Sequence, residues 1–214
     1  PEGRSFDDDR TNPNRTGAPL TVARHDWGLS TEIGYASDIS AAKRRQFARL
    51  RRQHNRAQIA SKRERNQIHA FTRIRQITSS KSLPTQIRDN ACSLFRSAQN
   101  EDLLRGRSIE GFVAACLYAA CRLASVSRTI EEITAASQSS QSEFEAAYDA
   151  LNRDLGLPVE PTHPREYLPR FADQLDVSSA IERRAGELAE QTETEGILVG
   201  RKPSGVAAAC LYTA

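Results

Sequence analysis

The 214-residue sequence contains no methionine, 11 glycines, 9 prolines and only 6% aromatic residues. No segment approaches the roughly 18 consecutive apolar residues that a membrane-spanning helix needs, which excludes an integral helical membrane protein. The scarcity of aromatic residues argues against a β-sandwich or barrel. Alanine, arginine, glutamate and serine dominate instead, and this composition favours an all-α fold.

The sequence also lacks a CxxC pair and a secretory signal. Most of its cysteines lie within apolar helical patterns, where a small buried thiol is the usual role. We therefore expect neither a disulfide nor a metal site, and an intracellular location. The cysteines are Cys92, Cys116, Cys121 and Cys210.

The modest net charge of +3 conceals a strong asymmetry along the chain. Residues 43–75 contain 12 lysines and arginines against one acid, Glu64, so this segment carries +11 and the remainder carries −8. A concentrated basic segment on an otherwise acidic protein is typical of contact with a polyanion. A solvated basic helix face remains the alternative interpretation of the charge alone.

Apolar residues recur at helical spacing from Arg63 onward and predict five helices over residues 62–157. Pro84 suits the first turn of the second of these helices, and Ser108 precedes the third. Two capping boxes, in which a hydroxyl residue is followed three residues later by glutamate, predict the last two helix starts at Thr129 and Ser140. These two short-linked helices predict a helix-turn-helix corner. Before the five helices, we expect an extended or weakly ordered arm over residues 1–42 and a basic helix over residues 43–61.

An internal repeat divides the rest of the chain. RSIEGFVAACLYAA (residues 107–120) matches RKPSGVAAACLYTA (residues 201–214) at eight of 14 positions, with a constant offset of 94. We therefore predict an arm over 1–61, one helical unit over 62–157 and a second copy over 158–214. The second copy stops where Ala120 stands in the first, so we expect a truncated chain. Apolar residues expected to be partly uncovered are Ile181, Leu188, Val206 and Leu211.

Four segments together resemble the archaeal transcription factor B family, the counterpart of eukaryotic TFIIB. They are TGAPLTVARHDWGLSTEIG (16–34), KRRQFARLRR (43–52), GRSIEGFVAACLYAACR (106–122) and GRKPSGVAAACLYTA (200–214). The resemblance implies two cyclin-like five-helix repeats in tandem, the second truncated, behind an extended and partly helical basic arm. It also implies a general transcription initiation factor, not an enzyme.

The resemblance further implies the partners. Members of this family stabilise the TATA-box-binding protein on promoter DNA, recruit RNA polymerase and assist opening of the start site. We accordingly expect these three partners, no membrane contact, a monomer, and a place at the nucleoid of an archaeal cell. No cofactor is expected in this chain, because the zinc of the family lies in an N-terminal ribbon whose ligands are missing here.

The arm carries two groups of candidate residues under this resemblance. The reader of the family, which lies near the template strand, matches His25, Asp26, Trp27 and Thr31. No nucleophile motif or phosphate loop accompanies His25 and Asp26, so we expect no catalysis there. Trp27 could stack in the polymerase cleft or anchor the arm. The linker, which lies where the duplex opens and contacts nucleic acid or polymerase, matches Lys43, Arg44, Arg45, Arg49, Arg51, Arg52 and Arg56.

A second set of candidates for contact with DNA or the TATA-box-binding protein lies at helix ends. Arg107 and Arg201 stand at equivalent positions before helices, where they either face the nucleoprotein surface or cap a loop. Arg122, Arg128 and Thr129 lie at the entrance of the corner, where a cation and backbone N–H groups could receive a phosphate.

The helix after Ser140 departs from the family, which has basic residues at its start. Gln141, Glu143, Glu145 and Asp149 stand there instead, so we expect no strong DNA contact by this helix. Two rival functions stay open at this point: a cyclin-like module that binds only proteins, and a divergent regulatory paralogue without general initiation activity.

Overall fold

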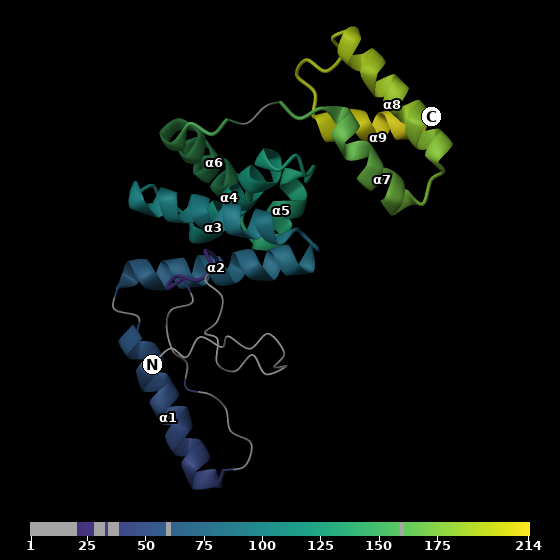
Figure 1. The fold of residues 1–214 in the computed structure, drawn as a ribbon. Coiled ribbons are helices and arrows are strands. Elements are labelled where there is room, and N and C mark those ends of the chain that lie inside the picture. Colours follow the sequence, from purple (N-terminus) through teal and green to yellow (C-terminus); the bar gives the residue numbers. More distant parts are fainter. Residues whose placement is uncertain (1–20, 28–32, 34–38, 59–60, 159–160) are drawn as a thin grey trace, which may run out of the picture.

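The computed structural model describes residues 21–27, 33, 39–58, 61–158 and 161–214, and every regular element in them is a helix (Figure 1). The all-α prediction is therefore confirmed. The first helix, α1 (Ala41–Gln58), begins two residues before the expected basic helix. It stands apart from α2–α9 and packs against none of them (Figure 1).

Five helices follow, in the number predicted from the apolar spacing. The helix α4 runs through the middle of this first repeat and packs against α3 and α6, and all its residues from Gly111 to Cys121 are buried. Small side chains on every side of α4 let its neighbours approach closely. The five helices are α2 (Lys62–Ser80), α3 (Thr85–Asn100), α4 (Ile109–Leu123), α5 (Ile130–Ser137) and α6 (Gln141–Leu155).

Hydroxyl side chains set four of the five helix starts in the first repeat. Ser108 Oγ accepts a hydrogen bond from the Gly111 amide at the start of α4. The boxes predicted at Thr129 and Ser140 both form, each with the glutamate three residues on, and a third forms at Ser61. Pro84 is the residue before α3 and not part of its first turn.

The contact between α4 and α6 depends on a glycine. A Cβ atom at Gly111 would lie 2.6 Å from the carbonyl oxygen of Glu143, closer than real Cβ contacts come. Further along the same interface, the Tyr118 ring packs edge-on against Phe144 and Tyr148, with centroid distances of 5.4 Å to each. These contacts bury Tyr118 to 9% exposure.

The second repeat reproduces the first with the same offset of 94 residues. Both ends of α8 lie 94 positions after those of α3, and α9 starts 94 positions after α4. The first helix of this copy is divided, because Pro164 and Pro169 each stand at a helix start. The elements are the 3-10 helix η2 (Pro164–Tyr167), α7 (Leu168–Leu175), α8 (Ser179–Thr194) and α9 (Pro203–Thr213).

The expectation of uncovered apolar residues in the second copy was half wrong. Val206 and Leu211 are buried against η2, α7 and α8, while Ile181 and Leu188 are half-buried. The most exposed large apolar side chain in the described part of the chain is Tyr212, at 94%, and Val199 and Leu175 are exposed as well. Tyr212 is equivalent to Tyr118, and the described part of the second repeat has no helix equivalent to α6 to cover it.

The two repeats have separate apolar cores and are joined mainly by polar side chains. Arg170 pairs with Glu132 at 2.5 Å, and Lys202 pairs with Glu131 at 2.7 Å. Both glutamates lie in the first turn of α5. Their pKa values are lowered: for Glu131 mainly by the hydrogen bond from Lys202, and for Glu132 by Arg170 in spite of an opposing effect of burial. Two ion pairs therefore hold the second repeat against α5.

Candidate nucleic-acid interface

The first basic surface is α1, whose sequence carries seven cations and no acid. All of residues 41–50 are exposed. Arg45, Arg49 and Arg52 follow one another at spacings of four and three, so they share one face of the helix. Phe47 and Leu50, 36% and 41% exposed, lie on the opposite face. The side chain of Arg56 lies outside the described residues.

The second basic surface, here called the basic groove, lies where α2 begins. Its volume is about 560 Å³, and four cations line it against one acid. Its cations are Lys62, Arg63, Arg105 and Arg107, and its acid is Asp102.

The turn between α3 and α4 presents two of these cations. Gly106 has a φ of +75°, a backbone conformation that favours glycine. Its two neighbours in the chain, Arg105 and Arg107, both line the basic groove. Arg107 is exposed, and its Nη1 donates to the carbonyl oxygen of Leu103 at 2.6 Å. The loop-capping role considered for Arg107 is therefore present. Because the guanidinium group is planar, this hydrogen bond also fixes the directions of its other N–H groups.

The second repeat keeps the turn but not the charge. Gly200 repeats the φ of +75°, and Arg201 is exposed at the position equivalent to Arg107. Val199 replaces Arg105, and Gly156 and Leu157 replace Lys62 and Arg63. The turn at Gly200 therefore forms without a cation at the position of Arg105.

The candidates at the corner already have partners within the protein. Arg122 Nη1 donates to the Tyr148 hydroxyl at 3.1 Å, and Arg128 Nη2 donates to the Lys81 carbonyl at 3.1 Å. Thr129 uses both its hydroxyl and its amide in the capping box of α5. Arg122 and Arg128 do line one hollow of about 280 Å³ between the repeats. Thr129 is thus a helix cap in this structure, and the two arginines remain candidates.

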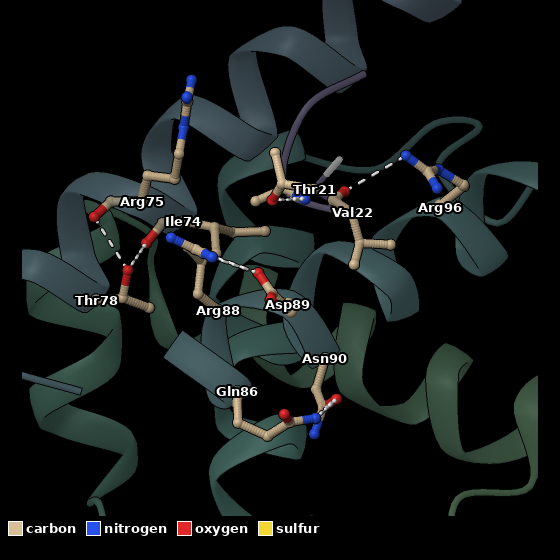
Figure 2. Close-up of polar contacts among 11 residues, drawn as sticks. Thr21, Val22, Ile74, Arg75, Thr78, Gln86, Arg88, Asp89, Asn90 and Arg96 are labelled. Atoms are coloured by element: carbon tan, nitrogen blue, oxygen red, sulfur yellow. Dashed lines mark hydrogen bonds and ion pairs between the residues drawn. The ribbon is translucent and has the colours of Figure 1, made fainter. Parts of the chain in front are cut away.

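The described part of the arm, residues 21–27, is folded into turns and packs on the first repeat. Ala23 is 2% exposed and belongs to the core of that repeat. Arg96 of α3 donates to the carbonyl oxygen of Val22 at 3.4 Å (Figure 2). It also donates to the carbonyl oxygen of Arg24 at 3.2 Å. The expectation of an extended arm over residues 1–42 is therefore wrong for residues 21–27, and most of the other residues of that range lie outside the described part of the chain.

The reader candidates lie at the end of these turns. Trp27 has a φ of +59° and is 46% exposed, and its ring stacks on the Arg96 guanidinium. This contact supports the role of Trp27 as an anchor for the arm. The Nδ1 atom of His25 lies 3.8 Å from Oδ1 of Asp26. Thr31 lies outside the described residues.

Sequence reasoning missed Lys62, Arg63 and Arg105 as members of one groove. The available signal was the comparison of the repeats, in which these cations are replaced while Gly106 and Arg107 are kept. It also missed Arg96, whose contacts join residues more than 70 positions apart.

Metal and thiol chemistry have little support in the described residues. They contain no group of three histidine, cysteine or acidic side chains arranged to hold a metal ion. Burial raises the pKa of Cys92 to about 12 and that of Cys121 to about 11, and it also raises that of Cys116. A separate search of these residues finds no helix long and apolar enough to cross a membrane.

Comparison with known proteins agrees with this architecture. The family model for the transcription factor TFIIB repeat matches residues 63–154 and 158–214. Transcription initiation factor IIB 1 of Halobacterium salinarum is 57% identical over the whole chain, which covers 75% of that protein. Factor IIB 5 of the same organism is 47% identical over 97% of the chain and 69% of its own length. Transcription initiation factor IIB of Methanococcus maripaludis is 42% identical over the whole chain and 65% of its own length. The chain therefore belongs to the transcription factor TFIIB family, a family of transcription initiation factors and not of enzymes.

Proposed function

We propose that this protein is a general initiation factor that stabilises the TATA-box-binding protein on promoter DNA, recruits RNA polymerase and assists opening of the start site. The observation that carries the proposal is the cationic surface formed by α1 and the basic groove. Its charge is concentrated in residues 43–75, where +11 stands against −8 in the remainder. Cations that neutralise phosphates release condensed counterions, which favours binding to nucleic acid.

The two faces of α1 suit two kinds of partner. Arg45, Arg49 and Arg52 present guanidinium groups that pair with phosphates. The opposite face offers Phe47 and Leu50, which are exposed and suit an apolar surface of the polymerase. In this proposal α1 lies between nucleic acid and polymerase.

The basic groove supplies the contact of the first repeat with DNA. The side chains of Lys62 and Arg105 make no hydrogen bond or ion pair with another described residue. Two unpaired cations beside Arg107 are well suited to phosphates. Arg122, Arg128 and Arg201 are assigned weaker contacts with DNA or the TATA-box-binding protein.

The remaining assignments follow the family. We propose an arm over residues 1–61 and repeats over 62–157 and 158–214. The protein acts as a monomer at the nucleoid, and zinc is assigned only to the N-terminal ribbon of the family.

Polymerase recruitment and open-complex formation on a TATA promoter test the role of α1. The variant R44A/R45A/R51A/R52A should lose both, because it removes four of the seven cations of α1. The control Q46A/Q53A changes two uncharged residues of the same helix and should retain both. Unchanged recruitment and opening in the arginine variant would contradict the proposal.

A specialised paralogue is the second candidate function. The Halobacterium salinarum relatives carry the numbers 1, 3 and 5, so that organism has more than one such factor. Transcription of a panel of promoters separates the two functions. A general factor supports most of the panel, whereas a specialised paralogue supports a small subset.

A further inference from the structure

One glutamate of the first repeat interacts with both repeats. The Glu132 carboxylate accepts a hydrogen bond from the Thr129 amide and so completes the capping box of α5. Its other oxygen lies 2.5 Å from Nη1 of Arg170 on α7. The same carboxylate is therefore held from within the first repeat and from the second repeat.

The pair of Arg170 with Glu132 is partly shielded from water. The two side chains are only 17% and 28% exposed. At such a position, removing one partner leaves the other charge without compensation, which is costly. The first repeat has Gln76 at the position equivalent to Arg170, so this cation is particular to the second repeat.

A second cation, Arg128, acts on the same carboxylate. Burial opposes the lowering of the Glu132 pKa, whereas hydrogen bonds to this carboxylate and the charges of Arg170 and Arg128 produce it. Nη2 of Arg128 donates to the Lys81 carbonyl oxygen at 3.1 Å. Its Nε is buried and has no partner among the described residues. Arg128 therefore has a donor available for a carboxylate, and a guanidinium and a carboxylate form strong hydrogen bonds.

The present position of Arg128 serves binding. The residue lines the hollow of about 280 Å³ between the repeats, together with Arg122. If Arg128 turned to Glu132, its charge would be neutralised by the carboxylate and would no longer be offered in this hollow. The partner that Glu132 takes thus decides how cationic the hollow is.

We infer that Arg170 is a positioning residue, which occupies Glu132 and thereby keeps Arg128 available for the complex of the TATA-box-binding protein with promoter DNA. Arg170 belongs to the second repeat and Arg128 to the first, so binding at the hollow depends on the contact between the repeats. The inference rests on the proposed function for the ligand, but not for the exchange of partners at Glu132.

Binding to this complex, measured by gel shift, tests the inference through a rescue. R170M keeps an apolar stem beside Phe171 and removes the guanidinium. It should weaken binding about three- to fivefold, because Arg128 then pairs with Glu132. R170M/E132Q should bind within about twofold of the unchanged protein, since glutamine completes the capping box but does not attract a cation. A residue that only held the repeats together would not be rescued, because the double variant also lacks the ion pair.

Two controls separate positioning from a general loss of charge. R165A removes an exposed cation of the second repeat that pairs with Glu190, and it should bind like the unchanged protein. In an R128A background, R170M should have no further effect, because the residue that it positions is gone. The pair of Lys202 with Glu131 stays in place in every variant.

NMR of the arginine Nε–H groups gives a readout that does not depend on DNA. In R170M the Nε–H signal of Arg128 should shift downfield as it pairs with Glu132, and R170M/E132Q should abolish the shift. Thermal unfolding establishes that each variant is folded. An Arg128 signal or a binding affinity that R170M leaves unchanged would overturn the inference, and so would equal weakening by R170M and R170M/E132Q. Absence of a supershift by the unchanged protein would contradict the proposed function instead, and the NMR signal would still decide the inference.

Discussion

The guanidinium carbon of Arg96 lies 4.2 Å from the centroid of the Trp27 ring. The same guanidinium binds the carbonyl oxygens of Val22 and Arg24, so one side chain of α3 holds the described part of the arm. Trp27 is the only tryptophan of the chain, and its fluorescence therefore reports this contact directly.

Replacing Arg96 should release the arm. R96A removes the stacking interaction and two charge-assisted hydrogen bonds, and we expect a loss of about 1–3 kcal/mol in unfolding free energy. The fluorescence of Trp27 should shift to the red as its ring becomes hydrated. The control Q86A removes an exposed hydrogen bond to Asn90 on the same helix and should leave the fluorescence unchanged. An unchanged spectrum in R96A would show that Arg96 does not hold the arm.

The helices could be predicted from local signals. The hydroxyl caps at Ser108, Thr129 and Ser140 depend on residues three positions apart, and all three form as expected. The offset of 94 is equally visible in the sequence and recurs in the bounds of α3 and α8.

The site could be predicted only in part. The exposed arginines of α1 are evident from charge density, but the packing of residues 21–27 and the basic groove join distant parts of the chain. No local pattern encodes such contacts. The division of the first helix in the second repeat depends on Pro164 and Pro169, which stand at the starts of η2 and α7.

Equivalent glycines should respond differently to the same substitution. G111A places a Cβ atom 2.6 Å from the Glu143 carbonyl oxygen and should cost about 1–3 kcal/mol through overpacking. G205A meets nothing within 4 Å and should be neutral or stabilise by up to about 1 kcal/mol. Urea unfolding of the two variants measures the difference. Equal stabilities would contradict the close approach of α4 and α6.

The ion pairs between the repeats should weaken in acid. The pKa values of Glu131 and Glu132 are lowered, so the pairs stabilise the arrangement above the ordinary glutamate pKa near 4.5 and are lost as pH falls through the lowered values. The change E131Q/E132Q should reproduce this loss at neutral pH, because glutamine still completes the capping box. Small-angle scattering should then show a larger radius of gyration.

The control for the ion pairs is E143Q, which changes the capping-box glutamate of α6. It should leave the radius of gyration unchanged. A double variant as compact as the unchanged protein would show that the ion pairs do not set the arrangement of the repeats.

The buried cysteines should resist alkylation. Burial raises the pKa of Cys92 to about 12 and that of Cys121 to about 11, so few thiolates form at pH 8. We expect iodoacetamide to modify these thiols only on unfolding, and mass spectrometry measures the rate. Rapid modification of Cys92 in the folded protein would contradict its burial.

The most direct test of the central claim is a gel shift with the TATA-box-binding protein and a TATA promoter. The account predicts that the protein supershifts the complex, that added salt weakens this binding steeply, and that K62A/R63A/R105A reduces it at least tenfold. Absence of a supershift by the unchanged protein would contradict the account and would favour a cyclin-like module that binds only proteins.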